Sequence, residues 1–276
     1  MGSMINTLAF PAPVLPKQFY DEELLPRQDL VELTTSEGEK IPACYVRARS
    51  STTDFVLGKE RMTLLYSHGN AEDLGLHLDY IDALAKYTGA DVFSYEYVGY
   101  SLSRLGGAEP SEEACLRSID AAWRYCVEQL GLPPKRLVIY GRSIGSGPSV
   151  DLASRERVEG TNASPLDAAG VLLQSPLESG GRAVLGYTAS WIGYGLDIFR
   201  NYEKIDRIKC PVAIMHGTAD EVVPFANGQA LHAKLQTPYE PLWIEGHGHN
   251  NMPQEKCFAY AKKFVDSLSP GASAAS

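Results

Sequence analysis

Tyr140-Gly141-Arg142-Ser143-Ile144-Gly145-Ser146-Gly147 is the stretch from which the fold of this 276-residue chain can be worked out. A β-branched and apolar run at residues 135–139 precedes it and is typical of a buried parallel strand. Residues 148–154 follow it and are expected to form a helix packed close to a sheet. Strand, Gly-x-Ser-x-Gly and helix in this order indicate a nucleophile elbow, a strained turn that lifts a serine clear of the sheet. The pattern predicts Ser143 as a nucleophile, and the alternative is a glycine-rich turn that happens to hold a serine.

Strand and helix patterns alternate on both sides of this elbow. We expect strands at residues 29–34, 44–47, 62–66, 92–95, 136–145 (together with the elbow), 169–174, 212–217 and 241–245. We expect helices at residues 74–87, 111–130, 148–154, 225–235 and 253–268. Such alternation with short connections predicts a mostly parallel sheet that is covered by helices on both faces.

Polar side chains that could carry out chemistry follow several of the expected strands. Parallel sheets place their sites at the carboxyl ends of the strands, where Ser143, Asp220 and His249 all fall. A serine hydroxyl needs a base and the base needs an orienting acid. We predict His249 as the base, with His247 as its rival. We predict Asp220 as the acid, with Glu221 as its runner-up.

The oxyanion of an acyl-transfer reaction would need two backbone donors. We expect them to be the N–H groups of Ile144, directly after the nucleophile, and of Asn70, in the loop after an early strand. His68, in the same loop, is expected to support that loop rather than to act as a catalyst. We predict no cofactor and no metal, because a zinc site built on His247 and His249 would need further ligands.

The order Ser…Asp…His is the order of an α/β-hydrolase fold. We expect one such domain at residues 29–268, with a twisted sheet of about eight strands and a small lid at 176–209. Residues 1–28 are proline-rich and are expected to be extended, with 1–3 resembling residues added for expression. The tail at 269–276 is rich in small residues and is expected to be disordered.

Composition and charge narrow the choice of partners. The net charge is -9 and the pI about 5.2, which argues against nucleic acid as a partner. No apolar stretch approaches the length of a membrane span, and residues 1–16 contain no basic leader. The five cysteines have no metal-binding spacing. We therefore expect a cytoplasmic protein. Peripheral contact with a membrane stays open as an alternative, although we identify no anchor in this sequence.

Several motifs of the chain occur together in one family of proteins. They are Leu65-Tyr66-Ser67-His68-Gly69-Asn70-Ala71-Glu72-Asp73-Leu74-Gly75, Phe93-Ser94-Tyr95-Glu96-Tyr97-Val98-Gly99-Tyr100, Gly141-Arg142-Ser143-Ile144-Gly145, Gln174-Ser175-Pro176-Leu177-Glu178-Ser179-Gly180, His216-Gly217-Thr218-Ala219-Asp220-Glu221-Val222 and Pro241-Leu242-Trp243-Ile244-Glu245-Gly246-His247-Gly248-His249-Asn250. With this combination, from about residue 7 to 266, the chain resembles the alpha/beta hydrolase domain-containing protein 17 family of protein depalmitoylases. The resemblance implies Ser143 as nucleophile, Asp220 as acid and His249 as base.

The chain departs from the pattern of that family in two respects. Animal members begin with a palmitoylated cysteine cluster that holds them on membranes, whereas no cysteine precedes Cys44 here. The family pattern has Gln at the position of Arg142 and Gly at that of Ser101. We expect Arg142, beside the nucleophile, to alter which acyl or leaving groups are accepted.

These observations together predict a serine hydrolase that cleaves acyl thioesters or esters through an acyl-enzyme. Its substrate would be an acylated protein or a small acyl thioester or ester. Tyr187, Trp191 and Tyr194 are expected either to line a channel for the acyl chain or to form the core of the lid. The alternatives are a serine peptidase of the S9/S33-type clan, a general carboxylesterase, and a non-catalytic binding module on a hydrolase scaffold.

Overall fold

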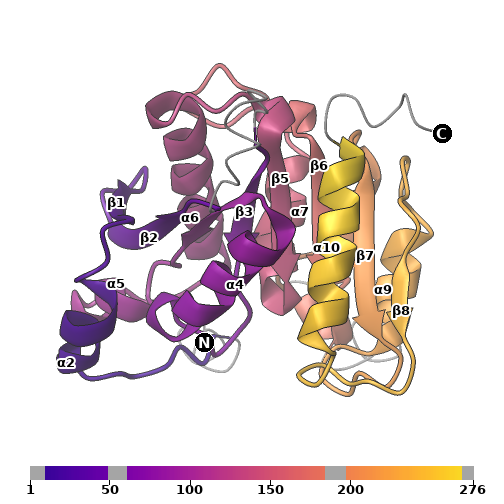
Figure 1. The fold of residues 1–276 in the computed structure, drawn as a ribbon, viewed down its shortest axis with the longest axis horizontal. Helices are drawn as coiled ribbons and strands as arrows, with labels where there is room; N and C mark the ends of the chain where they lie inside the picture. The colour runs from indigo at the N-terminus through magenta and orange to yellow at the C-terminus, as the bar shows by residue number, and fades with distance from the viewer. Residues whose placement is uncertain (1–9, 49–60, 184–196, 269–276) are drawn as a thin grey trace.

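The computed structural model describes residues 10–48, 61–183 and 197–268, and within these ranges the strands form one sheet (Figure 1). The strands are β1 (Leu30–Thr34), β2 (Lys40–Val46), β3 (Thr63–Ser67), β4 (Asp91–Tyr95), β5 (Leu137–Arg142), β6 (Gly170–Gln174), β7 (Val212–Gly217) and β8 (Leu242–Ile244). Their order is β1-β2-β4-β3-β5-β6-β7-β8. Strand β2 pairs antiparallel with β1 and β4, and the other neighbours pair in parallel. The predicted mostly parallel, eight-stranded α/β sheet is therefore confirmed.

Helices cover both faces of this sheet. The longer ones are α4 (Leu78–Thr88), α6 (Glu112–Arg124), α7 (Ser146–Ala153), α9 (Phe225–His232) and α10 (Gln254–Leu268). Figure 1 shows α4 and α10 in front of the sheet and α6 behind it. The short elements are α2 (Lys17–Phe19), α5 (Ser101–Leu105), the π turns η1 (Tyr20–Leu24) and η3 (Tyr125–Gln129), and the 3-10 turns η2 (Leu74–His77), η4 (Pro134–Arg136), η5 (Ser143–Gly145), η6 (Pro165–Asp167), η8 (Asn201–Glu203) and η9 (Ile205–Arg207).

The central strands are apolar throughout because both of their faces are covered. Successive side chains of a strand point to opposite faces, so Tyr140 and Leu172 lie in one core with α4 and α10. Their neighbours Ile139 and Leu173 lie in the other core, with α6 and α7. Burying a side chain of this size stabilises a fold by about 1.5–3 kcal/mol. The two cores hold β5 rigidly at the centre of the sheet, where the elbow begins.

The N-terminal segment is the main difference from the predicted elements. Residues 17–24 were expected to be extended, but they form α2 and the π turn η1. Tyr20 and Leu24 are buried, and the Tyr20 hydroxyl donates to Oδ2 of Asp73 at 2.8 Å. The extended prediction followed the prolines, whereas burial of these two side chains against the rest of the fold favours a helix. Residues 1–9, 184–196 and 269–276, on which other expectations for the N-terminus, lid and tail fall, lie outside the described residues.

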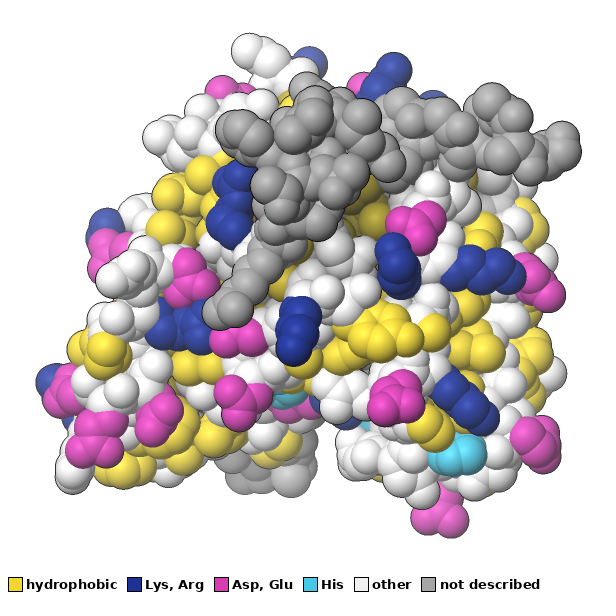
Figure 2. Space-filling view, viewed as in Figure 1, with side chains coloured by type: hydrophobic (Ala, Val, Ile, Leu, Met, Phe, Trp, Pro, Cys, Tyr) yellow, Lys and Arg dark blue, Asp and Glu magenta, His cyan; other side chains and the backbone are white. Residues whose placement is uncertain are grey.

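The surface carries both signs of charge. On the face shown in Figure 2, Lys and Arg side chains lie between Asp and Glu side chains rather than in a single patch. In the part of the chain that the structure describes, every helix is too short or too polar to cross a membrane.

Candidate active site

The turn after β5 holds Ser143 in a strained conformation. Its φ is 53°, in the left-handed region that is costly for a residue with a side chain. The two flanking glycines are required by close packing. A Cβ on Gly145 would lie 2.2 Å from the Ser67 carbonyl oxygen, and one on Gly141 would lie 2.5 Å from that of Gly145. The elbow can form because both positions lack a side chain.

Three side chains from three separate loops meet at this elbow. The Nε2 nitrogen of His249 lies 2.9 Å from Oγ of Ser143. Its Nδ1 nitrogen lies 2.7 Å from Oδ2 of Asp220. Ser143 and the His249 side chain each retain 8% exposure, whereas the Asp220 side chain is fully buried. A hydroxyl, an imidazole and a carboxylate in this order can take a proton from the serine as it attacks a carbonyl carbon.

The loops after β7 and β8 are fastened to each other, which brings Asp220 to His249. The Ala219 N–H donates to the His247 carbonyl at 3.0 Å. A Cβ on Gly217 would lie 2.2 Å from the same carbonyl oxygen, so this approach also depends on a glycine. The two residues are 29 positions apart in sequence, and their contact is fixed by backbone packing rather than by their side chains alone.

The Asp220 carboxylate is held in its ionised form. Its Oδ1 accepts from the N–H groups of Val222 and Val223 at 3.0 and 2.8 Å. Burial raises the pKa of Asp220, but hydrogen bonds from His216, His249 and the Val223 amide outweigh burial and keep the pKa well below its usual value. An ionised carboxylate beside Nδ1 keeps the proton on that nitrogen and leaves Nε2 free to accept one.

The rival residues are placed elsewhere. The Nδ1 nitrogen of His247 lies 2.7 Å from the carbonyl oxygen of Glu245, and the hydrogen bond is exposed. Glu221 is exposed beside the buried Asp220. His216 lies with its Nε2 2.9 Å from the Val223 carbonyl oxygen, and so orders the loop that carries Asp220. The geometry favours His249 and Asp220 over both alternatives.

The loop after β3 lies against the elbow. The close approach of Gly145 to the carbonyl groups of Ser67 and His68 brings the start of this loop to the turn that contains Ile144. Asn70 follows in the loop, and its Oδ1 accepts from the Tyr100 hydroxyl at 2.9 Å. The structure thus gathers the two expected oxyanion donors, Asn70 and Ile144, in adjoining segments.

His68 is a buried structural side chain. Its Nε2 lies 2.7 Å from Oε1 of Glu96, and its Nδ1 lies 2.9 Å from the Gly69 carbonyl oxygen. Burial lowers the pKa of His68, but the Glu96 carboxylate more than offsets burial and raises the pKa to about 9. A histidine that stays protonated at neutral pH cannot serve as a base. The expected supporting role fits these contacts.

A cluster of charged side chains beside the elbow was not predicted from the sequence. Glu72 forms ion pairs with Arg142 and, at 2.9 Å, with His77. Burial raises the pKa of Glu72, but the His77 hydrogen bond and the Arg142 charge lower it to about 2. The only sequence signal for this cluster is that Glu72 lies in the loop after β3 and Arg142 in the elbow.

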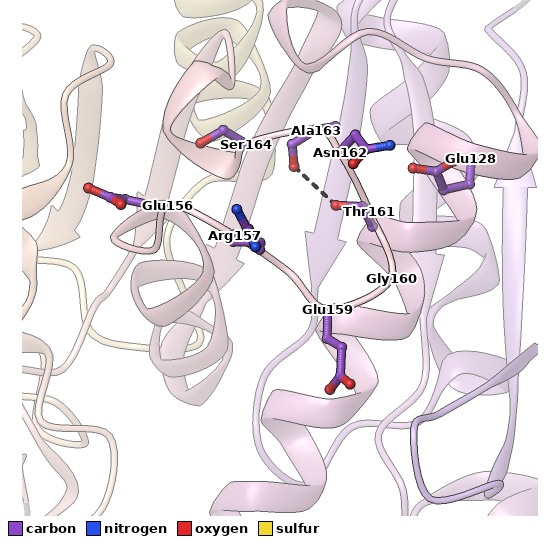
Figure 3. A pocket seen from close by; sticks show the side chains of 9 residues that line it. All are labelled: Glu128, Glu156, Arg157, Glu159, Gly160, Thr161, Asn162, Ala163 and Ser164. Atoms are coloured by element: carbon purple, nitrogen blue, oxygen red, sulfur yellow. Dashed lines mark hydrogen bonds between the residues drawn. The ribbon is translucent and has the colours of Figure 1, made fainter.

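A surface hollow of about 520 Å³ lies away from these residues (Figure 3). Most of its lining residues, among them Glu156, Arg157 and Thr161, lie in the segment that follows the last residue of α7, and Glu128 of η3 lines it as well. Helix α7 begins at the elbow, at the carboxyl ends of the strands, and runs back along the sheet. The hollow therefore lies near the amino ends of the strands, away from Ser143. In the described ranges, no group of three or more His, Cys, Asp or Glu side chains is arranged to hold a metal ion.

Comparison with known proteins gives close relatives in sequence. The alpha/beta hydrolase domain-containing protein 17B of Xenopus laevis is 41% identical over 218 residues, which cover 79% of this chain and 68% of that protein. The human protein of the same name is 40% identical over 218 residues, with the same coverage. Protein 17C of Mus musculus is 36% identical over 233 residues, covering 84% of this chain and 66% of that protein. No family model matches the chain.

Solved structures of similar fold include two esterases. An esterase of Thermogutta terrifontis superposes with a TM-score of 0.66 at 18% identity, covering 90% of this chain and 96% of that one. The esterase RhEst1 of Rhodococcus sp. ECU1013 gives a TM-score of 0.59 at 17% identity, covering 88% of this chain and all of that one. At this level of identity the likeness concerns the fold.

Proposed function

Because the chain belongs to the alpha/beta hydrolase domain-containing protein 17 family, and so is an α/β hydrolase, we propose that it is a serine hydrolase that cleaves acyl thioesters and esters. The observation that carries the proposal is the chain of hydrogen bonds from Ser143 through His249 to Asp220 on a strained elbow. We assign these three residues as nucleophile, base and orienting acid.

The reaction has two halves. In the first, His249 takes the proton of Ser143 as Oγ attacks the acyl carbon, and the same imidazole then protonates the departing thiolate or alkoxide. The serine is left as an acyl ester. In the second, His249 takes a proton from water, the resulting hydroxide attacks the ester, and Ser143 regains its proton as the carboxylic acid leaves. The N–H groups of Asn70 and Ile144 would stabilise the oxyanion of each tetrahedral intermediate.

For the physiological substrate, we propose a protein whose cysteine carries a long acyl chain. The sequence resemblance to protein depalmitoylases supports this choice. The segment between β6 and β7 also leaves room for a small lid only, which suits an acyl group presented on a protein surface. Tyr187, Trp191 and Tyr194, proposed to line the acyl channel, lie outside the described residues. Each methylene buried in such a channel would contribute about 0.8 kcal/mol to binding.

Two experiments test the proposal at its two levels. A fluorophosphonate should label the wild-type chain but not the Ser143→Ala variant. Labelling of the variant would show that Ser143 is not the nucleophile. A series of acetyl to palmitoyl thioesters should be hydrolysed with kcat/KM that rises with chain length, and Trp191→Ala should flatten that rise. Peptide amides, with their poor leaving group, should be cleaved far more slowly. Faster cleavage of amides would favour the peptidase alternative.

A further inference from the structure

Arg142 connects three loops of the active site through one guanidinium group. It is the last residue of β5 and directly precedes Ser143. Its Nη1 is ion-paired with Oε1 of Glu72, in the loop after β3. Its Nη2 donates to Oδ1 of Asn250, the residue after His249, at 3.4 Å. The side chain is therefore engaged by protein groups on both sides of the nucleophile.

The carboxylate of Glu72 holds the backbone of the loop that contains Asn70. Its second oxygen, Oε2, accepts from the Gly69 N–H at 2.5 Å and pairs with Nε2 of His77 at 2.9 Å. A Cβ on Gly69 would lie 3.0 Å from this carboxylate, so the backbone folds tightly onto it. On the other side of Asn70, Ala71 has a φ of 56°. The orientation of the peptide groups on either side of Asn70 thus depends on the position of the Glu72 carboxylate.

The position of this carboxylate in turn depends on Arg142. Both side chains are 17% exposed, so the Glu72 charge is only partly solvated and a partner must replace the lost water. The pairing of a guanidinium with a carboxylate is directional as well as attractive, and fixes the orientation of both groups. Without Arg142, Oε1 of Glu72 would lose its cation, and only His77 and the Gly69 amide would hold the carboxylate, both through Oε2. The carboxylate would then rotate about that oxygen and loosen its hold on the Gly69 amide.

We propose that Arg142 is a positioning residue, which acts through Glu72 to hold the Asn70 amide in place for the oxyanion. The inference rests on the proposed function of Ser143, because a positioned donor matters only if an oxyanion forms there. Arg142 would influence the rate without touching the substrate. Our expectation that Arg142 alters which acyl or leaving groups are accepted remains a separate prediction.

The test compares Arg142→Gln, Arg142→Lys, Glu72→Gln and the double variant Arg142→Gln/Glu72→Gln on p-nitrophenyl butyrate. Loss of a positioned oxyanion donor lowers transition-state binding, so kcat should fall about 10- to 100-fold in Arg142→Gln while KM changes less than about threefold. Glu72→Gln should show a similar loss, and the double variant should be no worse than either single variant. Arg142→Lys should recover part of the rate. The inhibition constant of a trifluoromethyl ketone should rise in parallel with the loss of kcat/KM.

Arg155→Gln is the matched control. Arg155 is also a partly buried arginine paired with carboxylates, those of Asp120 and Asp151, but it follows the far end of α7. Its replacement should lower the melting temperature without changing kcat. Hydrogen exchange of the Gly69, Asn70 and Ala71 amides should accelerate in Arg142→Gln and stay unchanged in Arg155→Gln.

The outcomes separate the two proposals. Unchanged kcat in Arg142→Gln, unchanged exchange in the loop, or an equal loss of kcat in Arg155→Gln would overturn the positioning role. A chain that is inactive on the ester, or a Ser143→Ala variant that keeps full activity, would instead overturn the proposed function. In that case the exchange measurement still decides whether Arg142 holds the loop.

Discussion

The Nδ1 nitrogen of His249 lies 2.7 Å from Oδ2 of Asp220, whose side chain is fully buried. The other carboxylate oxygen is occupied by two backbone N–H groups, from Val222 and Val223. The carboxylate is therefore fixed on one side by the chain and presents its remaining oxygen to the imidazole of His249, with Nε2 of His216 3.3 Å from that same oxygen. This contact sets the tautomer of His249, and it gives the first prediction.

Asp220→Asn should lower kcat/KM by roughly 10³- to 10⁴-fold while the fold is retained. The side-chain oxygen of Asn can still accept from the two backbone amides, which places its NH2 group against Nδ1. The imidazole would then carry its proton on Nε2 and donate to Ser143 instead of accepting from it. Ester hydrolysis by the purified variant measures the loss. The exposed neighbour Glu221 provides the control, and Glu221→Gln should be as active as the wild type.

His249→Ala should remove as much activity as Ser143→Ala, and the double variant should lose little more, because a nucleophile and its base act as one unit. His247→Ala should retain most of the activity, since its imidazole pairs with the Glu245 carbonyl rather than with the nucleophile. Single-turnover rates with an activated ester distinguish these cases. An inactive His247→Ala beside an active His249→Ala would show that the base is misassigned.

Gly145→Ala should prevent the elbow from forming. The added Cβ would lie 2.2 Å from the Ser67 carbonyl oxygen and 2.6 Å from that of His68, and these are backbone atoms that cannot move aside as a flexible side chain would. We expect destabilisation by more than about 4 kcal/mol, in the range reserved for severe core strain. Gly106→Ala is the control, because its Cβ would lie 3.3 Å from the nearest atom outside its neighbours. Urea unfolding curves of the two variants should differ clearly, and equal midpoints would contradict the packing argument.

The stability of the wild-type chain should depend on Asp73 at mildly acidic pH. Burial, followed by the nearby charge of Glu96, raises the pKa of Asp73 from 3.8 to about 6. Folding therefore favours the protonated form. The stabilising contribution is complete below the unfolded pKa and is lost as pH rises through about 6. We expect the free energy of unfolding to fall between about pH 4 and about pH 6.5 through this group.

Asp73→Asn should flatten that part of the pH profile, because an amide does not ionise and can still accept from the Gly75 N–H. Urea unfolding at the two pH values gives the comparison. The exposed Asp79 supplies a control, and Asp79→Asn should leave the slope unchanged. A wild-type slope that persists in Asp73→Asn would assign the effect to another group. Glu72, whose pKa is lowered to about 2, contributes in the opposite direction and at lower pH, so the two effects are separable.

Local patterns predicted most of the elements. The Ser111 cap of α6 shows why: its Oγ accepts from the Ala114 N–H at 3.1 Å, an interaction within one turn of the chain. The end of α9 is less well predicted, since the expected helix at 225–235 stops at His232. The helical turn around Tyr20 was missed because it depends on long-range contacts, namely burial of Tyr20 and Leu24 and a hydrogen bond from Tyr20 to Asp73, 53 positions away.

The sequence by itself determined the alternation of strands and helices, the Gly-x-Ser-x-Gly turn and the strand-end positions of Ser143, Asp220 and His249. These features depend on residues that are neighbours in the chain, so short-range patterns contain them. Only the tertiary structure decided that β2 runs antiparallel beside β4, that His249 rather than His247 contacts Ser143, and that Arg142 pairs with Glu72. Each of these depends on how loops from different strands pack at one edge of the sheet, and that packing is settled by the whole core at once.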